Sequence, residues 1–101
     1  MALPKKPVPP LRPSKPSRPA PPVDRVQTGV RLEKRLLKVL KALAELKDLS
    51  LGDLLEGIAL HALEGKPPLS PATMRESVKL RDVYGLTLRA ADSHRLEERR
   101  R

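Results

Sequence analysis

The chain has 101 residues, a net charge of +9, 12 prolines, no cysteine and a single aromatic residue, Tyr84. This length holds at most one small domain, and the lack of cysteine excludes disulfides, thiolate metal sites and a cysteine nucleophile. A core made only of leucine, valine and alanine is marginal in a monomer of this size, so we expect partner chains.

The excess of positive charge lies at the two ends of the chain. Residues 1–22 hold five basic and no acidic side chains, residues 23–66 hold eight basic and seven acidic, and residues 67–101 hold eight basic and five acidic. This distribution suits an anionic partner, with nucleic acid first and an acidic protein or membrane surface second. No apolar run approaches the roughly 18–20 residues of a membrane span, and the start does not read as a signal peptide, so we expect a cytoplasmic, nucleoid-associated protein.

Residues 1–23 are predicted to be a disordered basic arm, partly in the polyproline II conformation, because nine of the prolines fall within residues 4–22. The arm is either a solvated tail or a docking site for proline-reading domains. The next segment, residues 24–32, contains VQTGVRL, and its side chains alternate with a period of two, which predicts a strand. A lone strand in a helical chain has no ladder partner.

Two helices are expected after this strand. The first, residues 33–47, repeats apolar residues at the spacing of one helix face, namely Leu36, Leu37, Leu40, Leu43 and Ala44. Opposite them lie Lys34, Lys38, Lys41 and Glu45. The second starts at Ser50, which forms an approximate capping box with Asp53, and ends at Gly65. Its apolar face comprises Leu54, Leu55, Ile58, Ala59, Ala62 and Leu63.

The last third of the chain predicts less regular structure. Ser70 and Pro71 are a good helix start, and this helix is expected to run to about Asp82 before Tyr84 and Gly85 break it. A further helix is expected within residues 88–98. The region 67–101 is therefore interpreted as a partly helical C-terminal extension.

The order of a strand, a four-turn helix, a short turn and a capped second helix over residues 25–64 resembles the ribbon-helix-helix (MetJ/Arc/CopG) family of DNA-binding repressors. The resemblance implies a mainly α fold in which the strand pairs antiparallel with the same strand of a second copy, so residues 24–66 would be the dimerisation and DNA-binding domain. The expected dimer core comprises Val26, Thr28, Val30, Leu32, Leu36, Leu40, Leu43, Leu54, Leu55, Ile58 and Ala62.

The resemblance also implies the DNA contacts. The outward-facing readers of base edges would be Gln27, Gly29 and Arg31, although Gly29 has no side chain to read with. The expected phosphate contacts are Arg25, Lys34, Arg35, Ser50, Leu51 and Gly52. The start of the second helix departs from the common pattern, because Leu51 and Gly52 stand where polar, basic or hydroxyl residues are frequent, and Asp53 adds a negative charge.

No enzymatic activity, cofactor or metal is expected. His61 and His94 lack partners at catalytic spacing, and there is no glycine-rich phosphate loop or metal-ligand set. The preferred interpretation is a dimeric, repressor-like transcriptional regulator whose partners are double-stranded DNA and a second copy, with no membrane. The alternatives are an antitoxin whose residues 67–101 bind a protein partner, a DNA-segregation accessory protein, or a helical protein-binding module without DNA binding.

Overall fold

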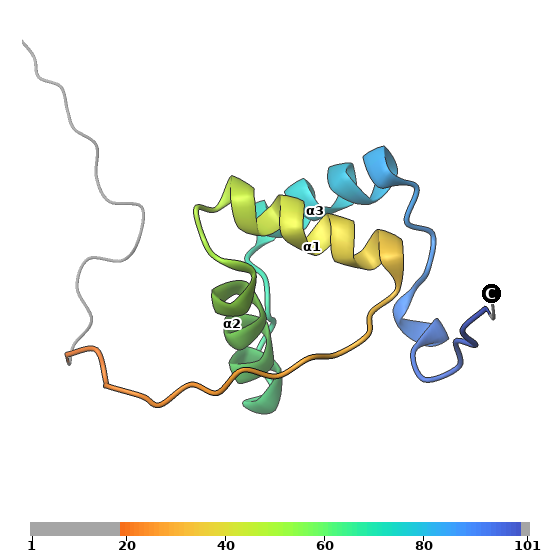
Figure 1. Ribbon diagram of the computed structural model, residues 1–101. Helices are drawn as coiled ribbons and strands as arrows, with labels where there is room; N and C mark the ends of the chain where they lie inside the picture. The colour runs from red at the N-terminus through yellow and green to blue at the C-terminus, as the bar shows by residue number, and fades with distance from the viewer. Residues whose placement is uncertain (1–18, 100–101) are drawn as a thin grey trace, which may run out of the picture.

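The computed structural model describes residues 19–99, and this part of the chain is mainly α-helical (Figure 1). Helix α1 spans Lys34–Leu46, α2 spans Leu51–Leu63, α3 spans Pro71–Tyr84, and a 3-10 turn, η1, spans Ala90–Asp92. The predicted mainly α class is confirmed. Most of the predicted N-terminal arm, residues 1–18, lies outside the described residues. None of the helices within residues 19–99 combines the length and the apolar character that a membrane crossing requires.

Helix α1 begins at an acidic cap and ends at a left-handed residue. The Glu33 carboxylate accepts a hydrogen bond from the Leu36 amide at 2.8 Å, which satisfies one of the free N–H groups of the first turn. At the other end, Asp48 has φ 59° and the Leu49 amide donates to the Ala44 carbonyl at 2.9 Å, as in a Schellman turn. The predicted helix is confirmed to within one residue at each end.

Serine starts both of the other α-helices and glycine follows both. The hydroxyl groups of Ser50 and Ser70 each accept a hydrogen bond from the amide three residues on, at 3.0 and 3.1 Å. Gly65 and Gly85 have φ values of 74° and 68°, a conformation that a residue with a Cβ atom rarely adopts. The sequence signals for these helix ends are therefore confirmed, although α3 continues two residues beyond the predicted end.

The core is small and is shared by all three α-helices. In Figure 1, α3 lies alongside α1, and α2 crosses below the end of α1. Leu43 is 2% exposed and is the most buried of its residues. The others are Ala44 and Leu54, with Leu40, Ile58, Leu69 and Leu80 packed against them. Leu69 and Leu80 belong to the C-terminal extension, so residues beyond 66 help to bury α1.

Helix α1 is covered on more than the one side that its spacing predicted. Val39 is buried although it lies outside the predicted apolar face. Val39 lies three residues after Leu36 and four before Leu43, so it widens the buried face. Helix α3 packs on α1, and the Lys47 ammonium lies 2.8 Å from a carboxylate oxygen of Glu76 on α3. The buried hydroxyl of Ser77 donates to the Met74 carbonyl at 2.8 Å, so α3 buries this polar side chain without losing a hydrogen bond.

Two elements differ from the sequence-based expectation. Residues 24–32 form no strand within the described chain, because a strand needs a neighbouring strand for its ladder hydrogen bonds and residues 19–99 supply none. The expected helix over residues 88–98 is also wrong. Only η1 forms there, since the Asp92 carboxylate accepts from the Arg89 amide at 2.8 Å and His94 turns into the left-handed region at φ 66°.

Candidate nucleic-acid interface

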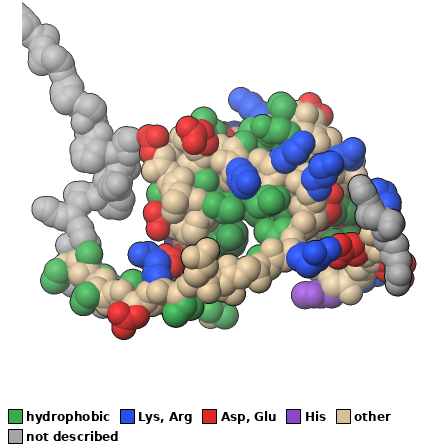
Figure 2. Space-filling view, viewed as in Figure 1, with side chains coloured by type: hydrophobic (Ala, Val, Ile, Leu, Met, Phe, Trp, Pro, Cys, Tyr) green, Lys and Arg blue, Asp and Glu red, His purple; other side chains and the backbone are tan. Residues whose placement is uncertain are grey.

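The segment 24–32 runs across α2 and then rises to the start of α1 (Figure 1). All of its residues are exposed, and hydrophobic side chains are visible between the segment and the helices above it (Figure 2). Val26 and Val30 are 85% and 71% exposed, which is unusual for valine in a folded chain. The apolar side of the predicted strand is thus left largely uncovered by its own chain.

A groove of about 720 Å³ separates this segment from the N-terminus of α2. Three of the expected phosphate contacts, Arg25, Ser50 and Gly52, line it together. The Ser50 hydroxyl accepts a hydrogen bond from the Asp53 amide. The N–H groups of Leu51 and Gly52 lie in the first turn of α2, where the helix itself offers them no acceptor. The structure therefore brings a guanidinium to a helix end that can donate hydrogen bonds to an anion.

Arg25 is held by acidic side chains of α2. Its guanidinium donates to both carboxylate oxygens of Glu56, each at 2.8 Å, and lies 3.7 Å from Asp53. The hydrogen bonds from Arg25 lower the pKa of Glu56 below its ordinary value, and Glu56 in turn raises the pKa of Arg25. This contact fastens the start of the segment to α2 and offsets part of the negative charge of Asp53 and Glu56 at that helix end.

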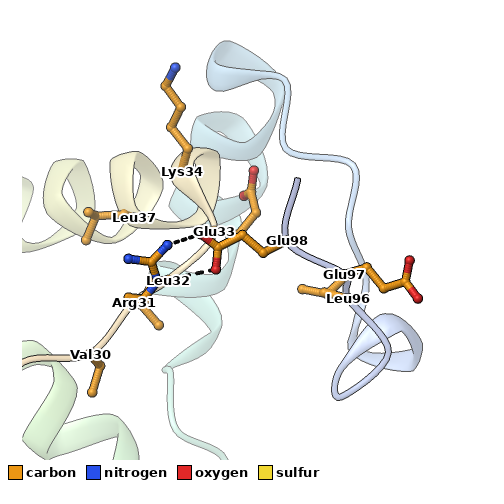
Figure 3. Close-up of a pocket in the computed structure, with 9 residues that line it drawn as sticks. All are labelled: Val30, Arg31, Leu32, Glu33, Lys34, Leu37, Leu96, Glu97 and Glu98. Carbon is orange, nitrogen blue, oxygen red and sulfur yellow. Dashed lines mark hydrogen bonds and ion pairs between the residues drawn. The ribbon is translucent and has the colours of Figure 1, made fainter. Parts of the chain in front are cut away.

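Arg31 is held at the other end of the segment by the C-terminal tail. Its guanidinium makes two hydrogen bonds to the Glu98 carboxylate, 67 residues further along the chain (Figure 3). The two side chains line one groove of about 670 Å³ with Leu37 of α1 and Leu96 of the tail. Gln27 and Gly29, the other expected base readers, are exposed, and Gly29 has open space around it.

Basic side chains gather where α1 begins, α3 ends and the tail returns. Lys34, Arg35 and Lys38 line a recess of about 520 Å³ together with Tyr84 and Arg99. The Arg35 guanidinium donates to the Gly85 carbonyl at 3.3 Å, which ties α1 to the end of α3. Sequence reasoning expected a phosphate contact from the first two of these residues but missed Arg99, because no local pattern connects the tail with α1.

The residues expected in the dimer core fall into three groups. Leu43 and Leu54 are buried within the single chain. Leu36, Leu40, Leu55 and Ile58 are half-buried, whereas Val26, Thr28, Val30, Leu32 and Ala62 are exposed. The exposed group continues along the end of α2, where Leu60 is 65% and Leu63 is 83% exposed. Apolar surface is therefore left over on both the segment and α2.

The histidines show no catalytic arrangement. His61 donates from Nδ1 to the Gly57 carbonyl at 2.7 Å, one turn earlier in α2, and His94 lies in the exposed turn after η1. Within residues 19–99, no group of three or more histidine, aspartate and glutamate side chains is placed to hold a metal ion. The interpretation as a binding protein rather than an enzyme stays a prediction.

Comparison of the chain with family models, curated proteins and solved structures finds no match. The resemblance to the ribbon-helix-helix family therefore rests on the order and pattern of residues 25–64.

Proposed function

We propose that the protein is a homodimeric, sequence-specific DNA-binding regulator of transcription in which residues 24–32 of two copies pair as an antiparallel ribbon. The observation that carries the proposal is the segment itself. Val26 and Val30 are 85% and 71% exposed on a stretch of backbone that has no ladder partner within the described residues. Pairing with a second copy satisfies the backbone groups and covers both valines.

Exposed apolar side chains at the end of α2 are a second, separate reason to expect a dimer. Leu60 and Leu63 are strongly exposed, and a neighbouring hairpin seated on this end buries them. Burial of one such side chain contributes about 1.5–3 kcal/mol. Symmetry doubles each contribution in a dimer. The small core of the monomer is thereby extended across the interface, which suits a chain of this size.

The polar side of the paired segment then faces outward. The major groove of B-DNA admits a two-stranded ribbon. The Arg31 guanidinium matches guanine O6 and N7, the Gln27 amide matches adenine N6 and N7, and each such pair discriminates by about 1–3 kcal/mol. The basic arm of residues 1–22 precedes the ribbon and adds non-specific attraction to the phosphate backbone through counterion release.

Two measurements test this function. Sedimentation at micromolar concentration should give a dimer, and selection from a random duplex pool should enrich an inverted-repeat site. Arg31→Ala should then abolish most of the sequence preference while retaining the dimer. A monomer in sedimentation, or a pool in which no sequence is enriched, contradicts the proposal.

A protein-binding function is the second candidate, and the outer side of α3 favours it. Met74 and Val78 lie one turn apart on α3 and are 46% and 57% exposed. Such an apolar surface fits a protein partner of the kind that an antitoxin binds. A protein that forms dimers, enriches no duplex and is protected along α3 by a partner would support this candidate over the first.

A further inference from the structure

The recess at the start of α1 is lined by none of the side chains proposed to form the dimer core or to read bases. It is lined by four cationic side chains, those of Lys34, Arg35, Lys38 and Arg99. Glu33 is the one acidic residue that lines it, and its carboxylate already accepts the hydrogen bond from the Leu36 amide. The recess therefore carries a net positive charge.

Helix α1 and the C-terminal tail supply these cations, and α3 forms part of the wall between them. Lys34 and Lys38 are four residues apart on α1 and therefore share a side of the helix. Figure 2 shows several lysine and arginine side chains on the part of the surface that α1 forms. Helix α3 contributes Tyr84, and the returning tail contributes Arg99. Like charges this close repel one another, so the arrangement is more stable when an anion lies between them.

Within residues 19–99, the ion pairs of the structure involve neither Lys34, Lys38 nor Arg99. This contrasts with Arg25 and Arg31, which both have carboxylate partners. The recess thus gathers four cations against the single carboxylate of Glu33.

The recess is continuous with the segment proposed to read DNA. Lys34 lines both the recess and the groove that contains Arg31. The three residues from Arg31 to Lys34 span at most about 10 Å, so a duplex seated on Arg31 passes close to the recess. Phosphates follow one another along each strand at about 3.4 Å of helix axis, so one of them falls within reach.

We infer that the recess formed by Lys34, Arg35, Lys38 and Arg99 is a binding site for the DNA backbone, which takes a phosphodiester group flanking the base pairs read by residues 27–31. The inference rests on the proposed DNA-binding function. It assigns a role to Lys38 and to the C-terminal tail, and it makes α3 part of the interface, because α3 positions the wall that carries Tyr84.

The test compares Lys38→Gln with Lys41→Gln. Both changes remove one positive charge from an exposed position of α1, but Lys41 does not line the recess. The dissociation constant of one duplex is measured at several salt concentrations. Loss of one phosphate contact lowers the slope of log K against log salt by about 0.9, or about 1.8 for the two sites of a dimer. We expect this shift for Lys38→Gln and for Arg99→Gln, and none for Lys41→Gln.

The discrimination between the selected site and an unrelated duplex provides the second measurement. A phosphate contact carries no sequence information, so Lys38→Gln should weaken both complexes by the same factor. Equal slopes for the Lys38 and Lys41 variants overturn the inference while the proposed function stands. A loss of discrimination overturns it as well, because it indicates a base contact. If the unaltered protein binds no duplex, the proposed function fails first and the inference fails with it.

Discussion

The contact between Arg31 and Glu98 predicts that the tail restrains DNA binding. DNA must displace the carboxylate before the Arg31 guanidinium can reach a base edge, so removal of the negative charge by Glu98→Gln should increase affinity. Glu97 is a matched control, because it is the neighbouring acid and points away from Arg31 in Figure 3. Both variants lose one negative charge and so gain equally from reduced repulsion of the phosphates.

The expected gain in affinity follows from the solvent exposure of the ion pair between Arg31 and Glu98. The side chains of Arg31 and Glu98 are 80% and 65% exposed, so the solvent screens their attraction strongly. A pair of this kind contributes about 0.5 kcal/mol, and two pairs in a dimer give about 1 kcal/mol, which is about fivefold in the dissociation constant. We expect Glu98→Gln to bind its selected duplex about fivefold more tightly than Glu97→Gln does.

Two assays check this prediction. Fluorescence anisotropy with a labelled duplex gives the dissociation constants of the two variants. Modification of Arg31 by phenylglyoxal, followed by mass spectrometry, reports on the ion pair without DNA and should be faster in Glu98→Gln. Equal affinities together with equal modification rates would refute the reasoning, since they mean that Glu98 does not hold Arg31 in solution. Faster modification with equal affinities would mean that the contact forms but that DNA does not compete with it.

Three further predictions concern the core, the cap of α1 and the interface. Leu43→Ala removes the most buried side chain and should lower the free energy of unfolding by about 2–5 kcal/mol in urea denaturation. The hydrogen bond from the Leu36 amide holds the pKa of Glu33 below its ordinary value of 4.5, so its stabilising effect is complete above that pH and is lost as the pH falls through the lowered pKa. The difference in unfolding free energy between the unaltered protein and Glu33→Gln should therefore shrink below pH 4.5, and an unchanged difference would exclude the cap. Leu63→Gln removes about 1.5–3 kcal/mol per subunit from the proposed interface and should weaken the dimer at least 100-fold in sedimentation, whereas Val83→Gln on α3 should leave it unchanged.

The helix ends were predictable from sequence because their causes are local. A serine hydroxyl reaches the amide three residues on whatever the rest of the chain does, and glycine adopts a positive φ without strain, so Ser50, Ser70 and Gly65 could be recognised directly. The left-handed Asp48 gave a weaker signal, since aspartate tolerates this conformation but does not require it.

The features that sequence reasoning missed depend on distant residues. The packing of α3 on α1 is one of these features, because no spacing within α1 predicts a second covering helix. The burial of Val39, in contrast, could have been read from its spacing of three and four residues to Leu36 and Leu43. A helix was expected within residues 88–98, but the Asp92 carboxylate accepts a hydrogen bond from the Arg89 amide, and this bond closes a single 3-10 turn that ends at Asp92. The candidate site shows the same limit, because Arg31 and Glu98 lie 67 residues apart and meet only when the tail returns to α1.

The ion pairs at the two ends of the segment suggest an order of events for the proposed function. Arg25 is fastened to Glu56 and Arg31 to Glu98, so the segment is anchored at both ends while Gln27 to Val30 between them stays exposed. The backbone of this middle part can pair with a second copy without breaking either contact. Binding of a base by Arg31, in contrast, requires release of Glu98. Dimerisation should therefore precede DNA binding, and the contact of Glu98 with Arg31 should oppose only the second step.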